Sequence, residues 1–564
     1  IGEASRLLDE GRILAVKGIG GVHIACGTTD DGPIARLRRT FNRPQQPFAV
    51  MSRDVETVRS FAEITPQEEK LLTSYRRPIV LLRKRDDFPL SELVSPGLDT
   101  VGVMLPYSGI HHLLLRRCGG PAYVMTSANI SGLPMIIDNA QALSELRGKV
   151  DYLLLHNRRI ANRCDDSVVK VVDGRTAFIR RSRGYVPEPV YLKFSSDKNI
   201  LALGAEFNVT SSLLTGNRCF VSQHIGDAEK LETLEYLRSA SNHLSSLLGI
   251  DRVGVIAHDL HPNYATTRLA RRMGTELGVP TVPVQHHHAH LCALMAEHGL
   301  EEIVGVAADG VGYGEDGTAW GGEVMFADFT SYRRTGGLKK QRMPGGDLAA
   351  IYPARMVAGM LWDVMDENEI RRVLIERCGG WLRRGELEAN AVLRQLETNL
   401  NVHWTTGCGR VLDAISCALG ICGERTYEGE PAIKLEAVAA SGDPELARID
   451  PELTKEDGKT VLDTSKLLLD VIEHLEKKTP VKHIAAAAHI AIAGGLAEVA
   501  VEAAEQRGTK DVGASGGVFY NRIITRVLRE DVERNGLRFL RHELLPCGDG
   551  CISVGQAISA AKRV

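Results

Sequence analysis

The chain has 564 residues, a formal net charge of −3 and a hydrophobic content of 44%. Because a single hydrophobic core stops growing at about 250–300 residues, this length predicts at least two domains. The near-neutral charge offers no basic field for a nucleic-acid backbone, and no apolar run reaches the roughly 18 residues that cross a bilayer, so we expect neither nucleic acid nor membrane as a partner. The 11 cysteines include no Cys-x-x-Cys pair, which argues against a disulfide or zinc-ribbon framework and is typical of a reduced, cytoplasmic protein.

The N-terminal third alternates short apolar strands with amphipathic helices, which is the pattern of an α/β domain. Strands are expected at 13–16, 78–82, 122–125 and 168–172. A proline-containing seam from Val186 to Asp197 favours extended backbone and predicts a linker over 188–199. We therefore expect a first domain over 1–187 and a second part over 200–564.

The second part repeats the α/β alternation. Its expected strands are 200–203, 253–257 and 301–308. A helical insertion is expected at about 354–404, a short strand at 511–513 and a closing helix at 551–562. About 365 residues are enough for two lobes.

The sequence from Val284 to His290 holds four histidines in five residues. His286 and His290 are four apart, and on a helix this spacing places both imidazoles on one face, one turn apart, as a bidentate metal clamp requires. A histidine-rich start of a polar surface helix is the plainer alternative. With carboxylates, neutral imidazoles suit iron, zinc or manganese.

Two glycine-flanked aspartates could complete such a site. Asp309 follows the expected buried strand, and Asp549 lies just before the closing helix. Each alone is typical of an ordinary turn, but a short aspartate next to glycine also lets backbone approach a phosphate while the carboxylate faces a cation. Together with the histidines they predict one metal–nucleotide centre.

A third loop follows the short strand near the C-terminus. Gly516 and Gly517, after Ser515, leave bare backbone at the start of a helix, where amide groups point outward toward an anionic ligand. Asn521, slightly further on, could read a base or ribose.

At these residues the second part resembles the ASKHA (actin-like ATPase) transferases, which include tRNA threonylcarbamoyl transferases and carbamoyltransferases. The strings 257–263, 285–290, 320–323 and 515–519 are similar to the HypF branch. The resemblance implies metal ligation by His286, His290 and Asp549, with Asp309 as a further ligand or water-bridged partner. It also implies a nucleotide site; its residues would be Gly204, Asp413, Glu428, Ser515, Gly516, Gly517 and Asn521.

The first part resembles YrdC-type domains, which make acyl or carbamoyl adenylates from ATP. The strings that carry this resemblance are 17–21, 43–44, 127–131, 162–167 and 180–184. Fixed guanidinium groups would stabilise the charge that develops as pyrophosphate leaves. The implied catalytic residues are Lys17, Arg43, Ser127, Asn129, Arg163 and Arg181.

The chain departs from the family pattern at a few positions. Phe41 and Gln46 stand where YrdC-type domains carry lysines near Arg43, and Asn208-Val209 replace a usual Lys-Asn pair in the loop that begins at Gly204. Lys17 and the arginine cluster of Arg180, Arg181 and Arg183 could supply the missing positive charge.

Taken together, the resemblance is to hydrogenase-maturation carbamoyltransferases of the HypF type, whose members carry acylphosphatase-like and zinc-finger regions ahead of the matching part. It implies a YrdC-like domain followed by a two-lobed ASKHA domain. The implied cofactors are ATP with Mg²⁺ and one divalent metal, iron or zinc. The implied substrates are ATP and carbamoyl phosphate, and the implied carbamoyl acceptor is the C-terminal cysteine of HypE.

Two other functions remain open. One is O-carbamoylation of a small-molecule alcohol, although related enzymes of that kind place the ASKHA-type domain first. The other is a non-catalytic ASKHA nucleotide-binding scaffold, which would have no need of paired histidines.

Overall fold

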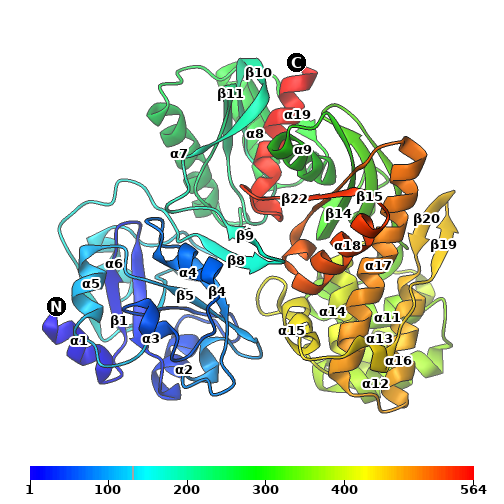
Figure 1. The fold of residues 1–564 in the computed structure, drawn as a ribbon, viewed down its shortest axis with the longest axis horizontal. Coiled ribbons are helices and arrows are strands. Elements are labelled where there is room, and N and C mark those ends of the chain that lie inside the picture. Colours follow the sequence, from blue (N-terminus) through cyan, green and yellow to red (C-terminus); the bar gives the residue numbers. More distant parts are fainter. Residues whose placement is uncertain (130–131) are drawn as a thin grey trace. The chain divides into compact units, whose positions relative to one another are not determined.

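In the N-terminal part of the computed structural model, a mixed sheet in the order β7-β1-β2-β6-β3-β5-β4-β8-β9 carries the predicted strands (Figure 1). The structure describes residues 1–129 and 132–564, so Ile130 and Ser131 of the predicted 127–131 loop lie outside the described residues. Pairing of β2 with β6 sets His23 opposite Ser127. The strands are β1 (Leu14–Lys17), β2 (Val22–Gly27), β3 (Ala49–Met51), β4 (Ile79–Arg83), β5 (Thr100–Met104), β6 (Tyr123–Ser127), β7 (Tyr152–Leu154), β8 (Val168–Val172) and β9 (Arg175–Arg180).

Apolar side chains on this sheet form a continuous core with the surrounding helices. Phe41, just after α2, is 5% exposed within that core, so a charged lysine at this position would be buried at a cost. The helices are α1 (Gly2–Asp9), α2 (Asp31–Thr40), α3 (Val55–Val58), α4 (Pro66–Thr73), α5 (Gly109–Leu115) and α6 (Asn139–Glu145).

The segment predicted as a linker, 188–199, lies in a strand instead. β10 (Pro189–Ala202) pairs with β11 (Ser212–Val221) across two register shifts. Val190 and Leu192 are buried while Tyr191 and Lys193 are exposed, which is the alternation of a half-buried strand. The predicted linker was based on the prolines and serines of this segment and did not use the two-residue period of its apolar side chains.

A four-stranded sheet in the order β11-β10-β12-β13 follows. Its other strands and flanking helices are α7 (Leu231–Leu247), β12 (Val255–Asp259), α8 (Ala265–Leu277) and β13 (Thr281–Val284). The chain forms two compact units: the first comprises Ile1–Val282 with Glu543–Ala557, and the second Pro283–His542 with Ile558–Val564.

The second unit is built on a sheet in the order β19-β20-β16-β15-β14-β21-β22, with β18 joining β15 and β17. Its strands are β14 (Glu302–Tyr313), β15 (Ala319–Asp328), β16 (Tyr332–Leu338), β17 (Gln341–Pro344), β18 (Val402–Thr405), β19 (Leu453–Glu456), β20 (Lys459–Leu462), β21 (Asp511–Ser515) and β22 (Arg538–Arg541). Its helices are α9 (His286–His298), α10 (Asp347–Ile351), α11 (Ala354–Leu361), α12 (Glu367–Cys378), α13 (Glu386–Thr398), α14 (Cys408–Ala418), α15 (Glu430–Ala439), α16 (Thr464–Glu476), α17 (Val481–Arg507) and α18 (Arg522–Arg534). The closing helix is α19 (Ile552–Arg563).

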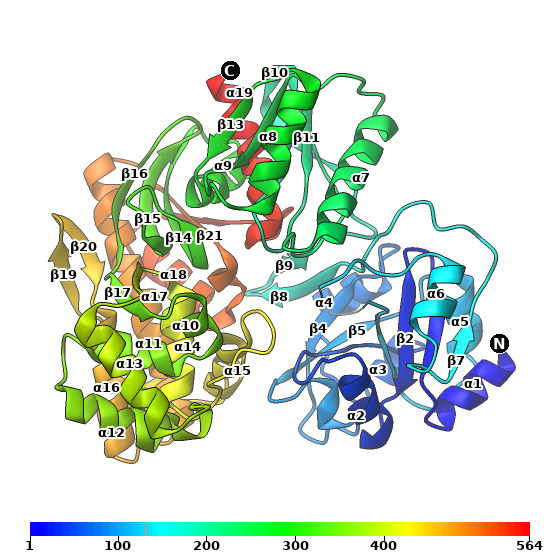
Figure 2. The same cartoon turned by 180° about the vertical axis from the view of Figure 1, so that it is seen from behind.

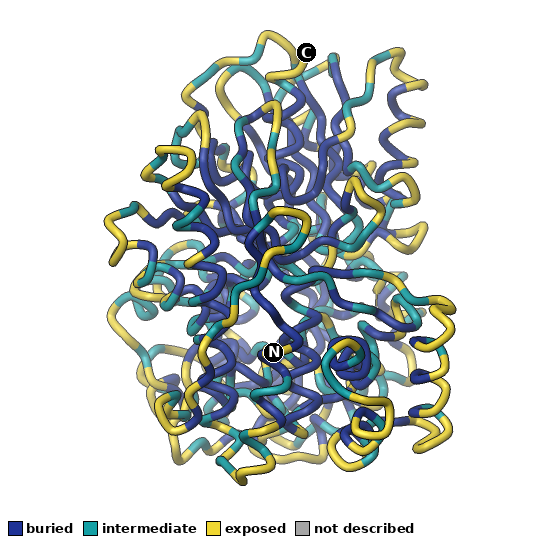
Figure 3. Tube along the Cα trace, turned by 90° about the vertical axis from the view of Figure 1, so that its right-hand side faces the viewer, coloured by how far each residue is buried: buried dark blue, intermediate teal, exposed yellow. Residues whose placement is uncertain are grey.

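The predicted helical insertion is confirmed as α11, α12 and α13, which gather with α16 at one end of the unit, and its last residues form β18 (Figure 2). By length and composition alone, α17 could cross a membrane, but 83% of its apolar window is buried in the protein. That burial is typical of a core helix. Buried positions follow the inner strands and helix faces, and exposed ones gather on loops (Figure 3).

All 11 cysteines are free, and ten are buried. Burial raises the pKa of several of these thiols, to about 12 for both Cys26 and Cys408. The structure therefore confirms that no disulfide framework supports the fold.

Candidate metal and nucleotide sites

The two predicted histidine ligands lie on one face of α9. The Gln285 side chain accepts a hydrogen bond from the His288 backbone N–H at 2.8 Å, and this cap starts the helix at His286. The ring centroids of His286 and His290 are 5.2 Å apart, and the two residues are 1% and 0% exposed. The predicted helical spacing is confirmed, and it gives a buried pair of imidazoles one turn apart.

Asp309 lies in β14, where pairing with β15 shifts register between Ala308 and Gly312. Its Oδ2 is 3.3 Å from Nε2 of His290. That oxygen is buried and accepts no hydrogen bond from any described residue. Gly312 leaves room for the neighbouring histidines of α9: a Cβ there would lie 2.4 Å from Cε1 of His287 and 2.9 Å from Cδ2 of His286.

The four residues predicted as metal ligands come together. One ligand atom from each of His286, His290, Asp309 and Asp549 lies within 4.8 Å of all the others. Two imidazole nitrogens with carboxylate oxygens form a donor set that suits a divalent iron, zinc or manganese ion. The buried Asp309 oxygen would gain a partner from such an ion, so the residues fit the predicted metal.

The glycine loop passes directly against Asp309. Gly516 has a φ of +115°, and a Cβ there would lie 2.0 Å from the Ala308 carbonyl oxygen. A Cβ at Gly517 would lie 3.2 Å from Oδ1 of Asp309. Only glycine can supply the backbone of Gly516 at this crossing, so the loop offers bare backbone beside the proposed ligand carboxylate.

Two polar side chains of this region, both predicted to contact nucleotide, have partners within the protein. The Ser515 hydroxyl lies 3.0 Å from Nδ1 of His290 and 2.9 Å from Nε2 of His542. Asn521 caps α18, its Oδ1 accepting from the N–H groups of the two residues at 523 and 524. A nucleotide contact by Asn521 would therefore use its amide nitrogen.

Asp413 lies in α14, one turn after Arg410, whose Nη2 is 2.8 Å from Oδ2 of Asp413. Burial raises the pKa of this carboxyl against the opposing charge of Arg410. The start of α14 packs on the Asp309 loop, because a Cβ at Gly407 would lie 2.5 Å from the Gly310 carbonyl oxygen. Asp413 therefore belongs to a helix anchored beside the proposed metal ligand.

The last two predicted nucleotide residues lie in turns. Glu428 is exposed just before α15. Gly204, at φ +72°, donates its N–H to Oε1 of Gln556 at 2.9 Å and accepts from Nε2 of Gln556 at 3.0 Å. With its N–H and carbonyl both engaged, Gly204 shapes the turn.

In the first unit, Arg43, Ser127 and Asn129 form one cluster. Arg43 donates to Oγ1 of Thr126 at 2.7 Å and to Oδ1 of Asn129 at 2.5 Å. The Ser127 hydroxyl donates to the same Asn129 oxygen at 2.9 Å. Burial lowers the pKa of Arg43 to about 10, which still leaves the guanidinium charged at neutral pH. The cluster is a preorganised, partly desolvated cation with adjacent hydroxyl and amide groups.

The other three predicted catalytic side chains bond elsewhere among the described residues. Lys17 donates to Oδ1 of Asn139 at 2.7 Å and to the carbonyl oxygen of residue 156. Arg163 donates to the carbonyl oxygen of residue 135 at 2.7 Å, and Arg181 donates to that of residue 188 at 2.9 Å. Arg43, Ser127 and Asn129 are therefore the members of the predicted set that meet.

Comparison with known proteins covers nearly the whole chain. Residues 6–182 match the family described as Telomere recombination (Sua5, YciO and YrdC), residues 195–297 the HypF Kae1-like domain, and residues 305–556 the second subdomain of the carbamoyltransferase Kae1-like domain. The probable carbamoyltransferase HypF of Methanocaldococcus jannaschii is 44% identical over 564 residues, covering 99% of this chain and 72% of the relative.

The chain belongs to the HypF carbamoyltransferase family. The crystal structure of T. kodakarensis HypF matches with a TM-score of 0.94 at 44% identity, over 99% of this chain and 73% of that one. A full-length HypF in a phosphate- and nucleotide-bound form matches with a TM-score of 0.93 at 37% identity, over 100% and 86%. The predicted fold, a YrdC-like domain followed by a Kae1-like domain of the ASKHA class, is confirmed, and the protein is a carbamoyltransferase.

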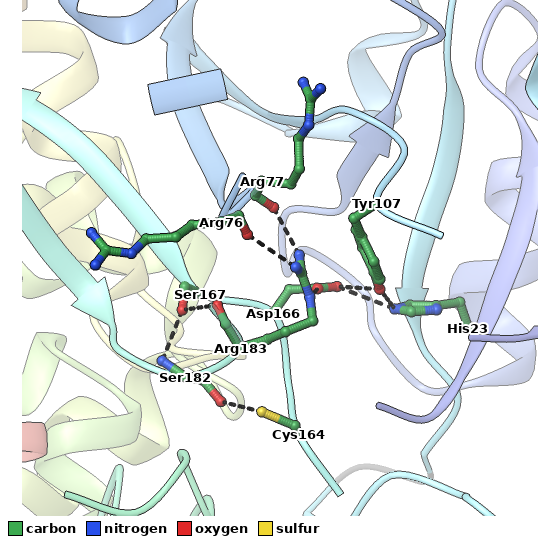
Figure 4. A network of polar contacts seen from close by, with 9 residues as sticks. All are labelled: His23, Arg76, Arg77, Tyr107, Cys164, Asp166, Ser167, Ser182 and Arg183. Carbon is green, nitrogen blue, oxygen red and sulfur yellow. Dashed lines mark hydrogen bonds and ion pairs between the residues drawn. The ribbon is translucent and has the colours of Figure 1, made fainter. Parts of the chain in front are cut away.

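This HypF-family chain also contains a buried ion-pair network that the sequence reasoning missed. Asp166 lies 3.2 Å from Nε2 of His23 and accepts from Nε of Arg183 at 2.6 Å (Figure 4). The Arg183 guanidinium lies over the Tyr107 ring at 3.5 Å. Because His23 pairs with Ser127 across β2 and β6, the network borders the Arg43 cluster. In the sequence, the feature that could have indicated this network is the pair of adjacent aspartates, 165 and 166, ahead of an arginine-rich segment.

Replacing Asp166 with asparagine is expected to destabilise the protein strongly at neutral pH. Burial alone would raise the pKa of Asp166, but the hydrogen bond with His23 and the charge of Arg183 outweigh it and hold this pKa well below its ordinary value. Breaking a buried pair costs about 3–5 kcal/mol. A depressed folded-state pKa stabilises above the unfolded pKa of about 3.9, and that contribution is lost as pH falls toward the folded value.

Urea unfolding of wild type and Asp166→Asn from neutral to acidic pH measures this difference. We expect it to be largest near pH 7 and to shrink below about pH 4. Asp87→Asn is the matched control, because Asp87 pairs with Arg85 at the surface and such pairs contribute about 0–1 kcal/mol. A difference that stays constant with pH would contradict the assignment.

Proposed function

We propose that this protein makes carbamoyl adenylate in its YrdC-like domain and transfers the carbamoyl group to the C-terminal cysteine of HypE from its Kae1-like domain, during maturation of nickel–iron hydrogenase. The observation that carries the proposal is the group formed by His286, His290, Asp309 and Asp549. The YrdC-like domain of the same chain contains the cluster around Arg43. Family membership supports ATP and carbamoyl phosphate as substrates, with Mg²⁺ accompanying ATP.

In the first step, hydrolysis of carbamoyl phosphate releases carbamate and inorganic phosphate. A carbamate oxygen then attacks the α-phosphorus of ATP, the bond between the α-phosphorus and the bridging oxygen breaks, and pyrophosphate leaves. Arg43 would stabilise the negative charge that develops, and its guanidinium, fixed by Thr126 and Asn129, supports this role because it needs no reorganisation. Ser127 and Asn129 present hydroxyl and amide groups for the carbamate and phosphate oxygens. Lys17, Arg163 and Arg181 would support anion binding at longer range.

In the second step, a thiolate attacks the carbamoyl carbon and AMP leaves. The bare backbone of Gly516 and Gly517 would hold the AMP portion, and Asp413 is proposed to reach the ribose. An ion held by the two histidines and two aspartates would supply Lewis-acid polarisation of the carbamoyl oxygen. Buried surroundings exclude water, which would otherwise hydrolyse the mixed anhydride. A related HypF has been obtained with phosphate and nucleotide bound, in keeping with nucleotide chemistry on this fold.

The test is ATP–pyrophosphate exchange with carbamoyl phosphate present or absent, followed by mass spectrometry of HypE incubated with the protein, ATP and carbamoyl phosphate. We expect exchange that requires carbamoyl phosphate, and a gain of one carbamoyl group on the terminal cysteine of HypE. HypE with that cysteine replaced by serine is the control. ATP binding without carbamoyl-dependent exchange would favour a scaffold, and carbamoylated alcohols with unmodified HypE would favour a small-molecule transferase.

A further inference from the structure

His290 is the first member of a chain of buried hydrogen bonds that leads away from the proposed metal group. Its Nδ1 lies 3.0 Å from the Ser515 hydroxyl, which lies 2.9 Å from Nε2 of His542. Nδ1 of His542 lies 2.8 Å from Oε2 of Glu297. The chain begins and ends on α9, since Glu297 is seven residues, or two turns, after His290.

The members of this chain are almost fully enclosed. Ser515 is 0% exposed, and the side chains of His542 and Glu297 are 1% and 2% exposed. Three different elements supply them: the end of β21, the residue after β22, and α9. Burying a carboxylate and two imidazoles is costly unless they bond one another, and here each group bonds its neighbour in the chain.

With a neutral His542 ring and a carboxylate at Glu297, the donors and acceptors of the chain have one consistent direction. An ionised Glu297 can only accept, so Nδ1 of His542 carries the proton and its Nε2 is the acceptor in the neutral ring. The Ser515 hydroxyl then donates to that Nε2, and its oxygen accepts from Nδ1–H of His290. In this tautomer the Nε2 of His290 has a bare lone pair, and this is the atom that lies 3.3 Å from Asp309.

We infer that Ser515, His542 and Glu297 are positioning residues that fix the tautomer and ring orientation of His290 for a divalent transition-metal ion. None of the three belongs to the group of ligand atoms. A histidine ligand is ordinarily oriented by a partner on its second nitrogen, and losing that partner weakens metal affinity about 10- to 100-fold. The inference rests on the proposed metal role of His290. Ser515 was predicted from the sequence to contact nucleotide; here its hydroxyl is assigned a hydrogen bond with His290.

The test measures Zn²⁺ affinity of the full chain by competition with a chromophoric chelator, together with the visible spectrum of the Co²⁺-loaded protein. Ser515→Ala removes only the linking hydroxyl, and His542→Leu removes both ring nitrogens. We expect each to weaken Zn²⁺ binding about 10- to 100-fold and to alter the Co²⁺ spectrum. His542→Gln, which keeps a donor and an acceptor, should recover part of the affinity.

His489→Leu is the matched control, because His489 is a buried histidine of α17 that bonds the Ala485 carbonyl; its Zn²⁺ affinity should equal that of wild type. Thermal unfolding of the metal-free variants verifies folding, and Ser515→Ala keeps the test valid should His542→Leu not fold. Unchanged affinity and Co²⁺ spectrum in Ser515→Ala, with binding abolished in His290→Ala, would overturn this inference alone. Unchanged affinity in His290→Ala would overturn the proposed metal site as well.

Discussion

Replacing His286 with alanine is expected to abolish carbamoyl transfer to HypE and to leave carbamoyl-phosphate-dependent ATP–pyrophosphate exchange intact. The substitution removes one of two imidazoles from a buried donor group, and Lewis-acid stabilisation is worth several kcal/mol, or about 10²- to 10⁴-fold in rate. Exchange should survive because the Arg43 cluster belongs to the YrdC-like domain. Both reactions are measured on one preparation, with metal content determined alongside.

His298→Gln serves as the matched control for this variant. His298 lies on the same helix but outside the ligand group, where it bonds the carbonyl of Arg541. It should keep metal content, exchange and transfer. Loss of exchange in His286→Ala, with the protein still folded, would refute the proposed division of labour between the domains.

Replacing Arg43 with glutamine should give the opposite pattern, with exchange lost and metal binding retained. Removing a preorganised charged donor typically costs about 10²- to 10³-fold in rate. Arg43→Lys should recover only part of that loss, because an ammonium keeps the charge but cannot reach Thr126 and Asn129 with a planar fork. Initial rates of exchange at saturating ATP measure the effect.

Arg39→Gln is the control, since Arg39 lies on the adjoining helix α2 and is exposed. Thermal unfolding must accompany the comparison, because Arg43 also donates buried hydrogen bonds within the fold. Wild-type exchange in a folded Arg43→Gln variant would remove Arg43 from the proposed catalytic group.

Local patterns predicted much of the fold. The strands at 168–172 and the closing helix agree with the structure to within a residue, because apolar runs and periodicity are local properties. The helix α9 was also predictable, because histidines four residues apart lie on the same face of a helix. The sequence did not predict that most of 188–199 forms β10, because the alternation of Val190 and Leu192 becomes meaningful only when β11 pairs with it.

The site was predictable in part for a similar reason. The spacing of His286 and His290 indicates metal binding locally, and the two aspartates gain that meaning only when they are considered together with the histidines. His542 and Glu297 carry no such local signal, because their significance comes from a serine that tertiary folding brings between two histidines. The ion-pair network of Asp166 was not predicted, although the strings 162–167 and 180–184 were identified, because its partner His23 is 143 residues away in the sequence.

The buried cysteines bear on the proposed transfer of an activated acyl group to sulfur. Such a reagent would also attack the enzyme's own thiols, and only the thiolate form is strongly nucleophilic. Cys408, which begins the helix packed on the Asp309 loop, is fully buried with a pKa raised to about 12, so it stays protonated at neutral pH. Under the proposed function, enclosure of this kind would protect the protein from self-carbamoylation and reserve each activated group for the incoming acceptor.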